Sequence, residues 1–288
     1  MSNRDETIAI IGTGEMGAAV GRRMREAGAR VLTSLNNRGS ASIERAARAQ
    51  LEVVDDDDRI AREASFILSI VPPGAAISVA QRFIEPMRKV DIRPIFADCN
   101  AVSPATARRI AEVFALRGCD FIDAGIIGGP PRPGYDPRFY ASGPRARAIE
   151  SLRKFGLDIE ILDDRIGTAS ALKMSYAGLT KGLVAIGAAM TSAALRAGLA
   201  PALKAELKRS QPTLLAMLAV GVQSMYPKAY RWIAEMEEIA DFLGAPSSGS
   251  TIYEGAARFY EQIARDWELG GEAGDSFQSA RAFFTEQR

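Results

Sequence analysis

The sequence predicts an α/β protein in which an N-terminal Rossmann-type doubly wound sheet is followed by an all-α C-terminal domain. From Thr7 to Leu162, short β-branched runs alternate with amphipathic helical stretches, the pattern of a mainly parallel sheet covered by helices on both faces. After Leu162 the sequence has no convincing strand pattern. A length of 288 residues suits one or two domains. We therefore expect two domains, over residues 1–164 and 165–288.

Six short runs are predicted as strands, and several are apolar on both faces, as in a sheet buried between helices. They span residues 7–12, 30–35, 51–54, 65–71, 94–99 and 120–124. Segments between them have helical apolar spacing and predict helices over Met16–Ala27, Ile43–Ala49, Ala75–Arg88 and Pro104–Leu116. The carboxylate run Asp55–Asp58 fits a solvated turn and a helix N-terminus, where negative charge is favoured. We expect no metal there, because separated oxygen ligands are missing.

The second half predicts helices alone. Thr168–Arg196 forms one long proline-free pattern, and shorter helices are expected near Pro201–Lys208, Thr213–Ser224, Ala229–Leu243 and Thr251–Glu268. The Ala- and Gly-rich stretch Gly178–Ala189 is typical of a tightly packed core helix or dimer helix.

The composition excludes several kinds of chemistry. The chain has no histidine, so a Ser-His-Asp hydrolase, a histidine metal site and a histidine proton shuttle are impossible. Its two cysteines, Cys99 and Cys119, form neither a CxxC pair nor a zinc cluster, and the count fits a reducing cytosol. A proton carrier near neutral pH must then be a lysine, tyrosine, cysteine or shifted carboxylate.

Charge and hydropathy predict a cytoplasmic protein that acts on a small molecule. Lys and Arg (36) nearly balance Asp and Glu (35), and a formal net charge of +1 gives no field that attracts nucleic acid or an anionic membrane. No apolar run reaches the length of about 18 residues that a membrane span needs. The N-terminal segment also lacks the basic start and long apolar core of a secretory signal.

A glycine-rich turn follows the first strand and opens a helix: Gly12-Thr13-Gly14-Glu15-Met16-Gly17. Gly12 permits the turn, Gly14 lets a pyrophosphate approach the backbone, and Gly17 lets the helix lie close to the strand. The free N–H groups of the helix then point at the phosphates. We expect the turn to bind a dinucleotide.

The segment after the second strand favours NADP over NAD. An NAD site usually ends this strand with an acid that binds the ribose 2′-hydroxyl, but no Asp or Glu occurs here before Glu44. Arg38 offers a guanidinium to a 2′-phosphate, and Asn37 and Ser40 add further donors. The alternative is an exposed arginine on a loop.

Further motifs follow in order along the chain. They are Val71-Pro72-Pro73 after the fourth strand, Asp98–Pro104 with Asn100 inside it, Phe121–Gly129 and Gly167–Lys173. With the glycine-rich turn, they resemble the β-hydroxyacid dehydrogenase superfamily, relatives of 6-phosphogluconate and 3-hydroxyisobutyrate dehydrogenase. The helical half looks most like a poorly characterised bacterial branch with its own C-terminal domain type.

The resemblance implies a role for each motif. Val71, Pro72 and Pro73 would line the cofactor, and Asn100 would lie near the nicotinamide ribose. The loop at Gly128 and Gly129 would hold the substrate carboxylate. Lys173 would be the catalytic lysine at the start of a long interdomain helix.

Three positions depart from the family pattern. Ile127 stands where the family usually has Ser, Ala177 where it has Asn, and Ala234-Glu235 where it has Lys-Asp. The backbone N–H groups of Gly128 and Gly129 remain able to hold an anion, while Ile127 predicts a larger or partly apolar substrate. The adjoining loop Pro130–Gly134 is interpreted as a rigid surface turn, with an anion contact by Arg132 as the alternative.

Lys173 is the predicted general acid–base. Its small or apolar neighbours would desolvate the ammonium and lower a pKa that is about 10.4 in a free lysine. The alternative is a lysine that snorkels from an interface helix. Tyr176 and Thr180 share the helix face of Lys173, and one of them is predicted to supply the polar contact that Ala177 lacks. The alternative for Tyr176 is packing in the interface.

These inferences combine into one predicted function. We expect an NADP-dependent oxidoreductase without a metal that transfers hydride between the nicotinamide and a 3-hydroxy acid or related alcohol. One alternative is an NADPH-dependent imine reductase, although such relatives usually carry Asp or Tyr where this chain has Lys173. Another is a non-catalytic NADPH-binding sensor or scaffold. The apolar interdomain helix and the resemblance predict a homodimer formed through the helical domain.

Overall fold

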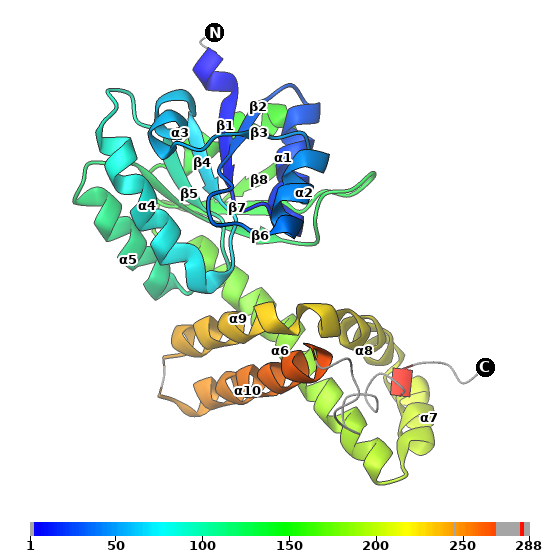
Figure 1. Cartoon of the computed structure of the whole chain (residues 1–288). Coiled ribbons are helices and arrows are strands. Elements are labelled where there is room, and N and C mark those ends of the chain that lie inside the picture. The colour runs from blue at the N-terminus through cyan, green and yellow to red at the C-terminus, as the bar shows by residue number, and fades with distance from the viewer. Residues whose placement is uncertain (1–2, 245, 269–282, 285–288) are drawn as a thin grey trace. The chain divides into compact units, whose positions relative to one another are not determined.

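The computed structural model describes residues 3–244, 246–268 and 283–284. The chain divides into two compact units, Met1–Met174 and Ser175–Arg288 (Figure 1). The first unit contains a sheet with helices, and the second contains helices among its described residues. The predicted fold class is therefore confirmed, while the domain boundary between residues 164 and 165 stays a prediction.

An eight-stranded sheet forms the centre of the first unit. Its strands are β1 (Thr7–Ile11), β2 (Arg30–Thr33), β3 (Glu52–Val53), β4 (Phe66–Ser69), β5 (Ile95–Asp98), β6 (Phe121–Ile127), β7 (Arg138–Ser142) and β8 (Asp158–Ile161). The spatial order is β3-β2-β1-β4-β5-β6-β7-β8. All neighbours pair in parallel except β6 and β7. The direction of winding reverses at β1, between β2 and β4.

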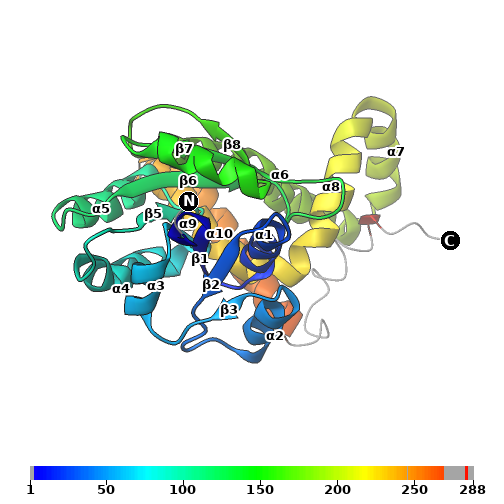
Figure 2. The same cartoon turned by 90° about the horizontal axis from the view of Figure 1, so that it is seen from above.

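Helices cover both faces of this sheet. The helices α3 (Asp57–Glu63), α4 (Ala76–Arg88) and α5 (Pro104–Ala115) lie on one side, and α1 (Glu15–Glu26) and α2 (Ser40–Arg48) lie on the other (Figure 1). Seen from above, β1 runs between α1 and α3 (Figure 2). Ile8 and Ile10 enter the core on one face and Ala9 and Ile11 the core on the other, as the two-residue period of a strand requires.

The strands β7 and β8 were not predicted. β8 alternates exposed Asp158 and Glu160 with the less exposed Ile159 and Ile161, so it lacks the continuous apolar run of the inner strands. An edge strand has one neighbour and tolerates a polar face.

The run Asp55–Asp58 leads into α3, where the Asp56 carboxylate accepts the Asp58 N–H at 2.9 Å as an N-cap.

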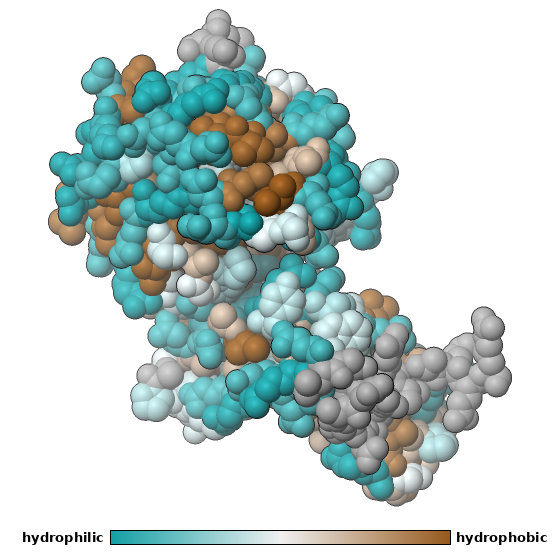
Figure 3. Space-filling model, in the orientation of Figure 1, coloured by the Kyte–Doolittle hydropathy of each residue, from teal (hydrophilic) through white to brown (hydrophobic). Residues whose placement is uncertain are grey.

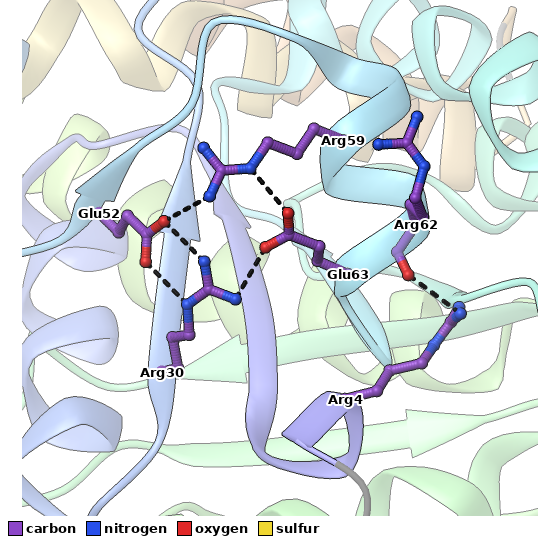
Figure 4. Close-up of polar contacts among 6 residues, drawn as sticks. All are labelled: Arg4, Arg30, Glu52, Arg59, Arg62 and Glu63. Atoms are coloured by element: carbon purple, nitrogen blue, oxygen red, sulfur yellow. Dashed lines mark hydrogen bonds and ion pairs between the residues drawn. The ribbon is translucent and has the colours of Figure 1, made fainter.

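An ionic cluster joins β2, β3 and α3 at the amino end of the sheet (Figure 4). Arg30 contacts Glu52 at 2.6 Å and Glu63 at 2.7 Å, and Arg59 contacts the same carboxylates at 2.8 and 2.7 Å. These hydrogen bonds lower the pKa of both carboxyl groups. The cluster therefore stabilises the fold above the ordinary pKa of glutamate, and the contribution is lost as the carboxylates are protonated in acid.

The described residues of the second half form five α-helices: α6 (Thr168–Arg196), α7 (Ala200–Ser210), α8 (Pro212–Met225), α9 (Ala229–Phe242) and α10 (Ser248–Glu268). The α6 pattern was predicted with the same bounds. An ion pair between the half-buried Lys181 of α6 and the buried Glu235 of α9 joins two of them, and the Lys181 ammonium lies 5.2 Å from the centre of the Trp232 ring. Tyr260 of α10 donates its hydroxyl to the Lys181 carbonyl at 2.5 Å.

Among the described helices, α6 alone has the length and apolar composition that a membrane span requires. Its most apolar window is 44% buried within the protein, and a core helix meets the same criteria. The helix also carries two lysines, Lys173 and Lys181. These features make α6 weak evidence for a membrane span.

Candidate active site

The glycine-rich turn has the shape of a phosphate cradle. A Cβ at Gly12 would lie 2.3 Å from the Ile70 carbonyl oxygen, and one at Gly17 would lie 1.9 Å from the Gly12 carbonyl oxygen. Gly12 also has a φ of +106°. A Cβ at Gly14, in contrast, would meet no atom within 4 Å. Two glycines therefore allow close packing, and the third keeps the space beside the turn open.

The helix that follows the turn begins without a side-chain cap. Gly14 is the N-cap of α1 and provides no side-chain cap for the N–H groups of the first turn. The N-terminus is the positive end of the helix dipole and favours an anion at this point. Glu15 is exposed at the first position, and Met16 is half-buried against the core. The residues present thus fit the pyrophosphate of a dinucleotide.

Thr13 and Arg45 fix the turn against α2. The buried Thr13 donates its hydroxyl to the Ser42 carbonyl at 3.0 Å, and Arg45 donates Nε to the Thr13 carbonyl at 3.0 Å. Thr13 therefore has a structural contact in addition to its predicted place beside the cofactor. Sequence reasoning did not identify Arg45, because its position in the middle of α2 carries no motif.

The loop after β2 contains the residues that are predicted to contact a 2′-phosphate. Asn37 is exposed with a φ of +59°, Arg38 is half-buried, and Ser40 is the exposed first residue of α2. Gly39 is the N-cap of α2 and provides no side-chain cap. Arg38 and Ser40 therefore lie at an uncapped helix N-terminus, which is tied to the glycine-rich turn through Ser42.

The strand ends of β4 and β5 are joined by Asn100. Its Oδ1 accepts the Val71 N–H at 2.6 Å, and its Nδ2 donates to Ser69 Oγ at 3.0 Å and to the Asp98 carboxylate. Asn100 is 3% exposed. It therefore positions the Val71 backbone, and its own cofactor contact stays a prediction. Pro72 is exposed and Pro73 is buried directly after Val71.

The buried carboxylate of Asp123 holds the start of α6. It lies on β6 and is 0% exposed. Its Oδ2 accepts the Gly167 N–H at 2.9 Å, the Ser170 N–H at 3.2 Å and the Ser142 hydroxyl at 2.9 Å, while Oδ1 accepts the Ser170 hydroxyl at 2.6 Å. One side chain therefore satisfies the N-terminal donors of α6 and links them to β6 and β7.

Lys173 follows this cap on α6 and returns to β6. Its ammonium donates to the Ile126 carbonyl at 2.6 Å. The stem of Lys173 packs over Gly125, where a Cβ would lie 3.1 Å from the Cβ of Lys173. The lysine is half-buried and does not extend freely into solvent. The only cysteine near this network, Cys99, is a poor proton carrier because burial and the charges of Asp98 and Asp123 raise its pKa well above the ordinary value.

The loop at Gly128 and Gly129, which is predicted to hold the substrate carboxylate, forms a hydrogen bond with a tyrosine. Gly128 has a φ of +127°, and the Gly129 N–H donates to the Tyr135 hydroxyl at 3.0 Å. The Arg132 guanidinium lies over the Tyr135 ring, 4.8 Å from its centre. Sequence reasoning missed Tyr135. A tyrosine after a Pro-Gly turn gives no signal of contact with a glycine six residues earlier.

Tyr176 and Thr180 belong to the second unit. Tyr176 is 49% exposed, and Thr180 donates its hydroxyl to the Tyr176 carbonyl of its own helix at 2.9 Å. Their predicted contact with substrate stays a prediction.

Comparison with known families identifies two regions of the chain. Residues 7–155 match the NAD binding domain of 6-phosphogluconate dehydrogenase, and residues 194–263 match a domain of unknown function (DUF1932). A 3-hydroxyisobutyrate dehydrogenase from Pseudomonas aeruginosa is 27% identical over 210 residues, or 70% of this chain and 68% of that protein. An uncharacterised 28.5 kDa protein from Methanothermus fervidus is 28% identical over 192 residues, or 67% and 72% of the two chains.

Solved structures share the fold over nearly the whole chain. A conserved protein of unknown function with structural similarity to 3-hydroxyacid dehydrogenases is 29% identical, with a TM-score of 0.66 over 93% of this chain and 100% of that one. The 3-hydroxyisobutyrate dehydrogenase of Mycobacterium tuberculosis, solved with L-serine, is 20% identical with a TM-score of 0.70, over 97% and 98%. An imine reductase from Myxococcus stipitatus is 18% identical with a TM-score of 0.55, over 97% and 99%.

Replacing Asp123 tests the connection between β6 and α6. We expect Asp123→Ala to lower the free energy of unfolding by about 3–5 kcal/mol, because two buried N–H groups and two hydroxyls lose their acceptor. Asp123→Asn should cost less, since one oxygen remains. Urea denaturation followed by circular dichroism measures both. In the control Asp120→Asn, loss of the exposed pair with Arg145 should cost at most about 1 kcal/mol. Equal losses for Asp123→Ala and this control would contradict the assignment.

Proposed function

The chain belongs to the β-hydroxyacid dehydrogenase superfamily, and we propose that it transfers hydride between NADP and a hydroxy acid with Lys173 as the general acid–base. Its class is that of an NAD(P)-dependent oxidoreductase of the hydroxyacid dehydrogenase type. The observation that carries it is the Lys173 ammonium, which lies beside the end of β6 at 2.6 Å from the Ile126 carbonyl.

The position of Lys173 suits proton transfer to a substrate oxygen. In the bound state, the nicotinamide would accept or supply the hydride. Lys173 would take the hydroxyl proton of an alcohol as a neutral amine, or donate a proton to a carbonyl oxygen as an ammonium. The Ile126 carbonyl holds the amine in one place, and Gly125 lets its stem lie against the strand. Because the amine is already in position, less entropy is lost when the substrate reaches the transition state.

Two features support NADP rather than NAD, while the cradle at Gly14 fits the pyrophosphate of either. The loop after β2 has no carboxylate for a ribose 2′-hydroxyl, and Arg38 and Ser40 lie at the uncapped N-terminus of α2. A 2′-phosphate carries charge that a guanidinium binds by charge-assisted hydrogen bonds. Arg45, which contacts the glycine-rich turn, adds a second positive charge to this region.

An NADPH-dependent imine reductase is the second candidate, favoured by the shared fold of the Myxococcus stipitatus enzyme. A non-catalytic NADPH-binding sensor or scaffold is the third. The chain offers an anchored lysine for proton transfer, which a sensor does not need. Turnover of hydroxy acids against cyclic imines separates the two enzymes, and cofactor binding without turnover of either identifies the sensor.

We also propose a cytoplasmic homodimer formed through α6. Hydrophobic residues reach the surface of the second unit (Figure 3). Five of them on α6 follow a spacing of three and four residues and are between 40% and 68% exposed: Tyr176, Leu179, Leu183, Ile186 and Met190. This is the spacing of a coiled-coil seam, in which two copies of one helix bury the same face against each other.

Removal of the lysine amine tests the catalytic proposal. We expect Lys173→Met to lower kcat for a 3-hydroxy acid such as 3-hydroxyisobutyrate by ~10²- to 10⁴-fold, the usual contribution of a general acid–base. The dissociation constant of NADPH, measured by fluorescence, should not change. Lys208→Met, at an exposed position on α7, is the matched control. Turnover that survives in Lys173→Met would refute the role of the lysine.

Cofactor preference is tested at the loop after β2. We expect Arg38→Gln to weaken NADPH binding by ~10- to 100-fold, because a hydrogen bond to a charged phosphate is lost, and to leave NADH binding unchanged. Fluorescence titration with both cofactors measures this. Arg62→Gln changes an exposed arginine of α3 and should affect neither. A wild-type preference for NADH would be incompatible with the proposal.

The dimer is tested by charge on the exposed stripe of α6. Sedimentation velocity should give twice the 30.9 kDa chain mass for the wild type and a single chain for the double variant Leu179→Glu/Ile186→Glu, because burying two carboxylates in an apolar seam is costly. The control Leu199→Glu/Ile252→Glu alters two residues of similar exposure off this stripe. A wild-type monomer, or a dimer in both double variants, would exclude α6 as the interface.

A further inference from the structure

The side chain of Arg82 on α4 reaches the end of β2. Its Nε and Nη2 each donate to one oxygen of the Asp57 carboxylate at 2.5 Å, and Nη2 also donates to the Ser34 hydroxyl at 2.6 Å. Ser34 directly follows β2 and is 1% exposed. A guanidinium that binds both oxygens of one carboxylate has a fixed orientation. Arg82 and Asp57 therefore hold the end of β2 against the first residue of α3.

The loop that follows Ser34 is held at a second point. Asn36 donates Nδ2 to the Asp55 carbonyl at 2.8 Å, and the Arg38 N–H donates to the Leu35 carbonyl at 3.0 Å, which closes a turn. Asn37 lies inside this turn in a left-handed conformation, which asparagine adopts more readily than most residues. The backbone is therefore anchored on both sides of the residue that leads into the turn.

The carboxylate run Asp55–Asp58 provides both anchors. Its second residue is the N-cap of α3, as expected for acids before a helix. Its first residue binds Asn36 through a backbone carbonyl, and its third binds Ser34 through Arg82. The run therefore connects the first turn of α3 to the loop after β2, in addition to capping the helix.

The Arg38 guanidinium depends on this backbone for its position. Among the residues that the structure describes, it has no hydrogen bond or ion pair that would hold it. Arg38 is four residues after Ser34, so a displaced serine displaces the arginine as well. The glycine-rich turn, in contrast, follows β1 and is tied to α2 through Thr13. The two parts of the proposed cofactor site thus have separate supports.

We infer that Asp57 and Arg82 are positioning residues for cofactor selectivity, because they hold Ser34 and so place Arg38 for the 2′-phosphate of NADP. The inference rests on the proposed preference for NADP. NADH has no 2′-phosphate and uses the glycine-rich turn without this contact. Loss of the anchor at Ser34 therefore weakens the binding of NADPH and spares that of NADH.

The test compares two acids of the same run. Asp57→Asn and Asp58→Asn each remove one negative charge from the first turn of α3 and one ion pair with the segment of α4, but only Asp57 is connected to Ser34. Fluorescence titration gives the dissociation constants of NADPH and NADH. We expect Asp57→Asn to raise that of NADPH by ~3- to 10-fold, the usual effect of losing one hydrogen bond, and to leave that of NADH unchanged. Asp58→Asn should change neither constant.

Ser34→Ala is the second variant, because it removes only the hydroxyl that Arg82 holds. It should change the ratio of the two constants in the same direction as Asp57→Asn. A destabilised fold would weaken the binding of both cofactors alike, so the ratio separates positioning from a general loss of structure.

Three outcomes distinguish the inference from the function on which it rests. If the wild type prefers NADPH but both variants keep its ratio, the inference is wrong and the preference for NADP stands. A wild type that prefers NADH would overturn the preference and the inference together. Neither titration needs turnover, so a failure to oxidise hydroxy acids would overturn the proposed reaction and not the role of Asp57 and Arg82.

Discussion

The contact between Asp123 and the first turn of α6 determines the geometry of the candidate site. A helix begins with several N–H groups that lack partners within the helix, and here a single buried carboxylate on the neighbouring strand accepts two of them. The same carboxylate binds Ser142 on β7. The start of α6 therefore cannot shift along the sheet without breaking several buried hydrogen bonds. Lys173 lies further along the same helix, so its position is fixed as well.

The carboxyl ends of the parallel strands bring the other site residues to one edge of the sheet. The glycine-rich turn follows β1, Arg38 follows β2, Val71 follows β4 and Asn100 follows β5. This is the edge at which doubly wound sheets bind ligands, beside the strand where the winding reverses. The ionic cluster of Arg30, Glu52, Arg59 and Glu63 lies at the amino ends of β2 and β3, so it supports the sheet without approaching the cofactor.

The sequence predicted those parts of the protein that follow from local patterns. Apolar runs located the first six strands, β1 to β6, and proline-free periodicity located α6 with its observed bounds. The edge strand β8 has a polar face, which removes the signal on which strand prediction depends. Contacts between distant residues were not predictable in the same way. The hydrogen bond from Gly129 to Tyr135 and the bond from Arg45 to Thr13 exist only after the chain has folded.

The close fit between Gly128 and Tyr135 restricts how this loop can evolve. Any side chain at position 128 would collide with the tyrosine hydroxyl, 2.3 Å away, and would also require an unfavourable φ of +127°. Pro137 also lies 3.1 Å from the position of such a Cβ. A side chain at 128 therefore requires the backbone to change together with its neighbours at 135 and 137, and a change at position 135 alone does not make room for it.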